Sequence, residues 1–244
     1  MLVIGFTFGQ EIGYRTMTEQ EWLQSTYLPE LLDAKNTRGS CRKYRLMAIA
    51  CCRRIWHLLD EKLRAAVELA ENFLERKATA KELKVCQDSF YDKSKFPGYT
   101  TQLGVVQSTC FPTNQIKFYA GNAVGAASWA QVDFLLSKRL DSKFDYETLR
   151  EQLYLEETAY QLVLFRDIFG NPFRPVQIER VRQTSTIKAI AQTIYTERQF
   201  ADLPILADAL EEAGCNNEVI LGHCRSNQEH VRGCWVIDLL LGKK

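Results

Sequence analysis

Apolar side chains recur at steps of three and four residues along almost the whole chain. Between Cys41 and Leu59, for example, Ile49, Cys52 and Trp56 continue one row that ends at Leu59. This spacing places side chains on one face of an α-helix, because each helical turn contains about 3.6 residues. We find no convincing pair of segments with the alternating pattern of strands. The sequence therefore predicts an all-α fold, an irregular multi-helix bundle.

Start and stop signals divide this pattern into separate helices. Thr18 and Thr79 each precede a glutamate by three residues, which is the capping-box pattern of a helix start. Asp145 is suited to cap a long helix, and Gly170 followed by Pro172 is suited to end it. The expected helices are about 18–26, 41–59, 60–77, 79–90, 114–140, 145–169, 185–197, 202–213, 217–225 and 230–241.

A chain of 244 residues can form one large domain or two modest ones. We expect a single all-α unit over 17–244, because Met17 opens a typical N-terminus, MTEQEW, with residues 1–16 as an upstream extension or a short edge strand. Proline and glycine interrupt the pattern over 91–114, which predicts a linker or packed loop. That segment separates N-terminal helices within 18–90 from C-terminal helices within 115–241.

Composition narrows the function classes. The formal net charge is +1, so no overall charge draws the chain toward nucleic acid or a membrane surface. The longest apolar runs are too short to cross a bilayer, and no export signal is present. We therefore expect a cytoplasmic protein without a membrane partner. Thiols stay reduced there, so most of the eight cysteines are expected to fill the core.

Cysteines and histidines gather near the C-terminus. Cys215, Cys224, His230 and Cys234 can form a tetrahedral zinc site if the ends of short helices converge, with His223 as a substitute ligand. His230 and Cys234 are four residues apart, the spacing at which two side chains share a helix face. No C-x₂-C pair, the specific part of most zinc signatures, is present. Buried structural thiols with surface histidines are the alternative.

Arginines concentrate on the helix expected over 41–59. Arg42, Arg45 and Arg53 fall on one stripe, which could contact the phosphates of a nucleic acid. The alternative is an ordinary solvated helix face with acidic neighbours. Arg53, Arg54 and Arg174 could instead join internal ion pairs that link the two ends of the chain. Candidate carboxylate partners for that network are Asp167, Asp208, Glu211 and Glu212.

Catalytic motifs are lacking in the sequence. His223 and Cys224 are neighbours, so on a helix they point about 100° apart and the histidine is badly placed to activate the thiol. His230 could reach Cys234, but Trp235 and Val236 imply burial. A thiol-based enzyme is therefore the third interpretation, and no catalytic residue is assigned.

Four segments resemble an uncharacterised bacterial family that is expanded in planctomycete genomes. They are MTEQEW at 17–22, CCRRIWHLL at 51–59, LFRDIFGNPFRPV at 164–176, and the C-terminal block that contains LPILADALEEAGC, HCR and HVRGCWVIDLLLGK within 203–243. The resemblance covers both ends, and the middle, about 84–160, departs from it. It implies the Met17 start and an all-α fold, but no activity.

These observations favour a non-catalytic protein-interaction or scaffold module whose protein partner is unknown. A zinc-stabilised or nucleic-acid-binding regulatory module is the alternative, in which zinc is the only cofactor implied.

Overall fold

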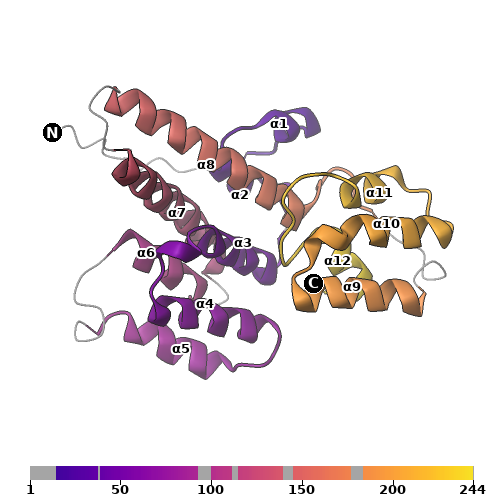
Figure 1. Ribbon diagram of the computed structural model, residues 1–244, viewed down its shortest axis with the longest axis horizontal. Helices are drawn as coiled ribbons and strands as arrows, with labels where there is room; N and C mark the ends of the chain where they lie inside the picture. The colour runs from indigo at the N-terminus through magenta and orange to yellow at the C-terminus, as the bar shows by residue number, and fades with distance from the viewer. Residues whose placement is uncertain are drawn as a thin grey trace.

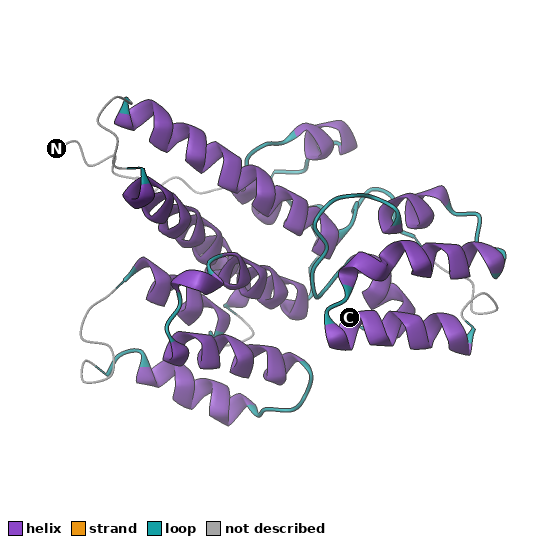
Figure 2. Ribbon diagram, viewed as in Figure 1, coloured by secondary structure: helices purple, strands orange, loops and turns teal. Residues whose placement is uncertain are grey.

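The computed structural model describes residues 15–37, 39–92, 100–111, 115–139, 145–176 and 184–243. Within these ranges the chain forms twelve α-helices and no strand (Figure 2), which confirms the all-α prediction. The helices are α1 (Glu19–Gln24), α2 (Leu28–Asp33), α3 (Cys41–Arg54), α4 (Glu61–Leu74), α5 (Ala80–Ser89), α6 (Thr101–Thr109), α7 (Ile116–Lys138), α8 (Tyr146–Phe169), α9 (Ser185–Glu197), α10 (Leu203–Glu212), α11 (Glu218–Cys224) and α12 (Trp235–Leu241). Two 3₁₀ turns are η1 (Trp56–Leu58) and η3 (Phe200–Asp202). None of the described helices combines the length and apolar character needed to cross a membrane.

The helix ends follow the local signals of the sequence. Thr18 and Thr79 both form complete capping boxes, and the Asp145 carboxylate accepts the Glu147 backbone N–H. Helix α8 ends at Gly170, whose φ of +66° is a left-handed conformation that glycine adopts without strain. These ends are therefore set by neighbouring residues rather than by distant contacts.

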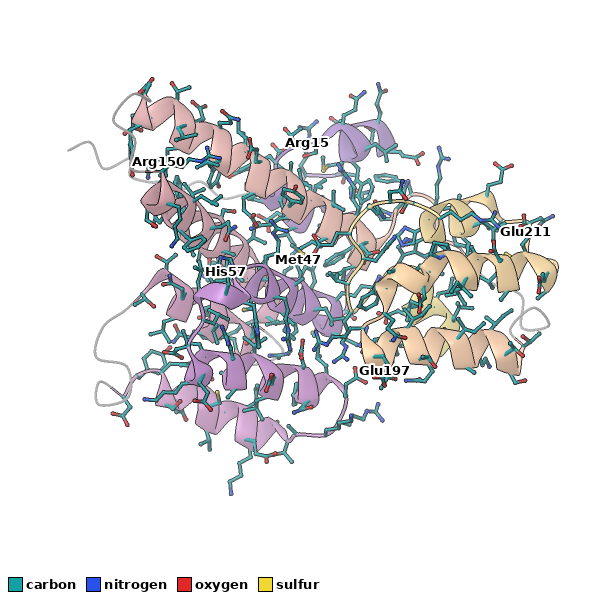
Figure 3. All side chains as sticks on the ribbon, in the orientation of Figure 1. Arg15, Met47, His57, Arg150, Glu197 and Glu211 are labelled. Carbon is teal, nitrogen blue, oxygen red and sulfur yellow. The ribbon has the colours of Figure 1, made fainter. Side chains whose placement is uncertain are left out.

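The first hydrophobic core is built around α3. This helix packs against α6, α7 and α8, and Met47 lies buried at its centre (Figures 1 and 3). Ala120, Ala123 and Ala127 give α7 a surface of small side chains, which lets α3 and α6 approach it closely. The long helices α7 and α8 pack side by side.

A second core lies within helices α9 to α12, drawn in orange and yellow in Figure 1. Its buried residues run from Ile187 to Leu240, whereas those of the first core run from Met17 to Ile168. The two cores meet where the C-terminal end of α8 contacts α12. This junction positions the site described below.

Residues 91–114 differ from the expected linker or packed loop. Thr101–Thr109 forms helix α6, which begins at the cap Thr100, and Val105 and Val106 are completely buried. The sequence pattern missed this helix because both faces are covered, so it has no polar stripe to reveal its period. Residues 93–99 and 112–114 of this segment lie outside the described residues, as do residues 1–14 of the expected extension.

Candidate metal centre

Four side chains with metal-binding atoms converge at the junction of the two cores. They are Asp167 in α8, His223 in α11, His230 in the following loop and Cys234 at the start of α12, and their ligand atoms all lie within 4.8 Å of one another. Zinc binds the same atom types at about 2.0–2.3 Å, which places tetrahedral ligand atoms about 3.3–3.8 Å apart. The observed group is thus close to the size of a zinc site.

Local backbone geometry brings these residues together. Asn217 caps α11 through two backbone N–H groups, and this short helix ends one residue after His223. Gly233 has a φ of +105°, which turns the chain between His230 and Cys234. A Cβ atom at Gly233 would lie 2.8 Å from a methyl carbon of Leu46 in α3. A side chain at Gly233 would therefore push the loop that carries His230 away from the first core.

Asp167 is the centre of the group, and it is completely buried. Its Oδ1 lies 2.6 Å from His230 Nδ1 and 3.1 Å from His223 Nε2, while Oδ2 accepts the Val231 backbone N–H at 2.9 Å. Burial alone would raise the pKa of Asp167, but the histidine hydrogen bonds outweigh it and hold the pKa below its usual value. Asp167 is therefore a buried carboxylate with three donors around it.

The outer nitrogens of the two histidines have different partners. His230 Nε2 lies 3.2 Å from the Ser226 hydroxyl oxygen, which can accept an N–H. His223 Nδ1 accepts the Trp235 indole N–H at 3.1 Å, because indole can only donate. The proton of neutral His223 consequently resides on Nε2 and points toward Asp167 and Cys234. Gln228 also approaches His223 Nδ1, at 3.4 Å.

Both cysteines near this group are buried thiols. Cys234 Sγ lies 3.2 Å from His223 Nε2, and burial raises the pKa of Cys234 well above its usual value. Burial together with the Asp167 carboxylate raises the pKa of Cys224 to about 12. A thiol nucleophile needs a lowered pKa and access to substrate. Neither cysteine has these properties in this structure.

The group differs from the expected ligand set. His230, Cys234 and the substitute His223 are brought together, whereas Cys215 and Cys224 are buried outside the group. Asp167, considered only as an ion-pair partner in the sequence, takes the remaining place. The sequence did contain one indication of Asp167, namely a carboxylate among the apolar residues of the last turns of α8. It does not indicate which distant residues lie opposite this carboxylate.

The predicted arginine ridge is absent, because all three side chains have internal partners. Arg42 binds both carboxylate oxygens of Asp238, and Arg53 binds both oxygens of Glu71. Arg45 is only 1% exposed and donates to backbone carbonyl groups. The prediction of a phosphate-binding stripe was wrong because α3 is covered by other helices on several sides, so its charged side chains contact protein groups.

The ion pairs that the sequence predicted for Arg54 and Arg174 have other partners than expected. Arg54 binds the buried Glu157 in α8, whereas Arg174 binds Glu19 in α1 at the surface. The third histidine, His57, is exposed in the 3₁₀ turn η1 (Figure 3) and contacts the Phe134 ring of α7.

Comparison of the chain with protein-family models, curated proteins and solved structures finds no match. The resemblance of the terminal segments to a planctomycete-expanded family therefore stays a prediction.

Proposed function

We propose that the chain is a non-catalytic scaffold module whose two cores are joined by a structural zinc ion. The observation that supports this proposal is the convergence of Asp167, His223, His230 and Cys234 within 4.8 Å. Two histidines, a thiol and a carboxylate are all established zinc ligands. The ligands come from both cores, so one ion would fix α8 against α11 and α12.

A structural role is favoured over a catalytic one by the burial of all four ligands. The side chains of Asp167 and His230 are 0% and 5% exposed, and that of His223 is 10% exposed. Catalytic zinc sites usually keep a coordination position open to water or substrate, whereas structural sites are closed by four protein ligands. This group offers four ligands and little solvent access.

The outer hydrogen-bond partner of His230 is compatible with zinc binding, whereas that of His223 must change. His230 keeps Ser226 as an outer hydrogen-bond acceptor, as metal-bound histidines commonly do. Zinc on His223 Nε2 would move its proton to Nδ1, where it faces the Trp235 N–H. The Gln228 amide can present its oxygen to that proton, and Trp235 must then shift. Zinc binding is therefore expected to change the surroundings of Trp235.

The experiment is metal analysis followed by cobalt substitution. We expect one zinc per purified chain, and a cobalt-loaded form with a tetrahedral spectrum and a sulfur-to-cobalt charge-transfer band. Cys234→Ser should remove that band, because its thiolate is the only expected sulfur ligand. A metal content well below one per chain, with no zinc uptake on titration, would refute the proposal.

Cys224→Ser is the matched control, because Cys224 is equally buried and adjacent in sequence to His223. We expect it to keep the cobalt band, as should Cys215→Ser. A weaker band in Cys215→Ser and Cys224→Ser as well as in Cys234→Ser would favour the ligand set suggested by sequence alone, in which all three thiolates bind the metal.

Neither a protein partner nor nucleic acid is identified by this site. A protein partner stays a prediction that suits a scaffold. Internal pairing of Arg42, Arg45 and Arg53 does not favour the nucleic-acid alternative.

A further inference from the structure

A cavity of about 870 Å³ lies beside the candidate metal centre, between the N-terminal segment and the second core. Its wall includes three aromatic side chains, Trp22, Phe169 and Trp235, beside charged side chains such as Lys43 and Asp238. Binding sites for small organic molecules commonly have this size and an apolar lining with a few polar groups. None of the four candidate metal ligands lines the cavity.

The cavity wall contains a half-buried lysine without a carboxylate partner. Lys43 in α3 donates one hydrogen bond, to the Phe169 carbonyl oxygen at 3.3 Å, and forms no ion pair with any described residue. An ammonium group has three donors, so two stay unused by described protein atoms. Burial lowers the pKa of Lys43, which reflects the cost of holding this charge away from water.

Nearby carboxylates are already neutralised by other cations. Arg42 binds Asp238, and Lys243 binds Glu75 at 2.8 Å. Glu75 also accepts the Tyr195 hydroxyl. Lys43 thus has no carboxylate of its own, although Asp238 shares the cavity wall, and Lys35 of the wall also forms no ion pair with a described residue.

We propose that this cavity binds a small organic acid, with its carboxylate on Lys43 and its apolar or aromatic body between Trp22, Phe169 and Trp235. The carboxylate oxygens of such a ligand supply acceptors for the two unused donors of the half-buried Lys43. The aromatic wall removes the body of the ligand from water. This site would give the scaffold a ligand-binding activity, and it does not depend on zinc.

The test compares three probes of one shape by titration calorimetry: 2-naphthylacetate, its neutral amide and 2-naphthyl phosphate. We expect the carboxylate to bind one site per chain at least about tenfold more tightly than the amide, the smallest gain for a charge-assisted hydrogen bond. Equal affinity of acid and amide, or no binding of either, would overturn the proposal. Tighter binding of the phosphate would overturn the assignment to a carboxylate.

Lys43→Met should abolish the preference for the acid over the amide, and Lys43→Arg should keep it. Lys188→Met, at an exposed lysine of α9, is the matched control and should bind as the unaltered protein does. Retained preference in Lys43→Met would refute the role of this lysine.

Lys43→Gln gives a second measurement if Lys43→Met does not fold. It keeps a polar side chain at this position but removes the positive charge, so we expect the acid to bind less than about threefold more tightly than the amide. An undiminished preference for the acid in a folded Lys43→Gln protein would place the carboxylate elsewhere and contradict the site as described.

Discussion

At the scale of single residues, the proton on His223 decides whether the candidate centre is a hydrogen-bond network or a metal site. The Trp235 N–H donates to Nδ1, which keeps the proton on Nε2, the nitrogen nearest Asp167 and Cys234. A metal ion at Nε2 must displace that proton. Trp235 therefore opposes metal binding although it is not a ligand.

We predict that Trp235→Phe binds zinc about three- to tenfold more tightly, because it removes a donor that favours the metal-free tautomer. A competition titration with a chromophoric chelator measures this change. Trp129→Phe, which alters a tryptophan that packs at a tilt against Tyr154, is the control and should leave zinc affinity unchanged. Weaker zinc binding in Trp235→Phe would show that the indole supports the site instead.

Glu71 is a second residue whose charge depends on its neighbours. It is buried and binds Arg53 in α3 and Arg198 after α9. Burial by itself would raise the pKa of Glu71, but the two guanidinium groups outweigh it and lower the pKa. A lowered folded-state pKa means that ionised Glu71 stabilises the fold above the unfolded pKa of about 4.3. That contribution disappears as the pH falls through the folded-state value.

We therefore predict that Glu71→Gln lowers the free energy of unfolding by about 1–3 kcal/mol at neutral pH. The difference in free energy of unfolding between this variant and the unaltered protein should become smaller as the pH falls below about 4.3, where Glu71 of the unfolded chain becomes protonated. Urea unfolding at several pH values measures this difference. A difference that does not change across this pH range would contradict the assignment.

At the scale of elements, the end of α6 depends on a side chain from another helix. Arg45 in α3 donates to the carbonyl oxygens of Thr109 and Phe111, at the C-terminal end of α6. The last carbonyl groups of a helix lack partners within the helix and carry partial negative charge. Buried Arg45 thus replaces solvent at this helix end, with its guanidinium 5.1 Å from the centre of the Phe73 ring.

We predict that Arg45→Met lowers the free energy of unfolding by about 1–3 kcal/mol, because the two carbonyl groups lose a buried donor. Thermal and urea unfolding followed by circular dichroism measure the loss. Arg150→Met, at a surface position of α8 (Figure 3), should change stability by less than about 0.5 kcal/mol. Equal effects of the two substitutions would exclude a special role for Arg45.

At the scale of the whole molecule, polar groups connect the two hydrophobic cores. Arg42 in α3 reaches Asp238 in α12, and Lys243 reaches Glu75 after α4. Asp167 in α8 likewise contacts His230 and the backbone N–H of Val231, in the loop before α12. The junction therefore relies on specific charge pairs as well as apolar contact between α8 and α12.

We predict that Asp238→Asn lowers the free energy of unfolding by about 3 kcal/mol or more, because it leaves Arg42 half-buried and unpaired. The rate of amide hydrogen exchange should increase most in α9 to α12, because these helices lose a contact with the first core. Asp208→Asn, in an exposed pair with Arg225, should cost no more than about 1 kcal/mol. Uniform exchange throughout the molecule would mean that the cores do not separate.

Local sequence was sufficient for much of the fold. Apolar rows, the capping boxes at Thr18 and Thr79, and the stop at Gly170 correctly predicted an all-α chain and several helix ends. These features act within one or two turns of helix, so they can be read without a partner. Helix α6 was missed because burial on both faces removes the polar stripe that marks a helix.

The sequence by itself determined which chemistry gathers near the C-terminus, namely histidines and thiols on short helices. Only the tertiary structure decided that Asp167 completes the group, that Cys215 and Cys224 stay outside it, and that Arg42, Arg45 and Arg53 turn inward. The physical reason is that periodicity fixes the face on which a side chain lies, whereas its partner depends on how distant helices pack.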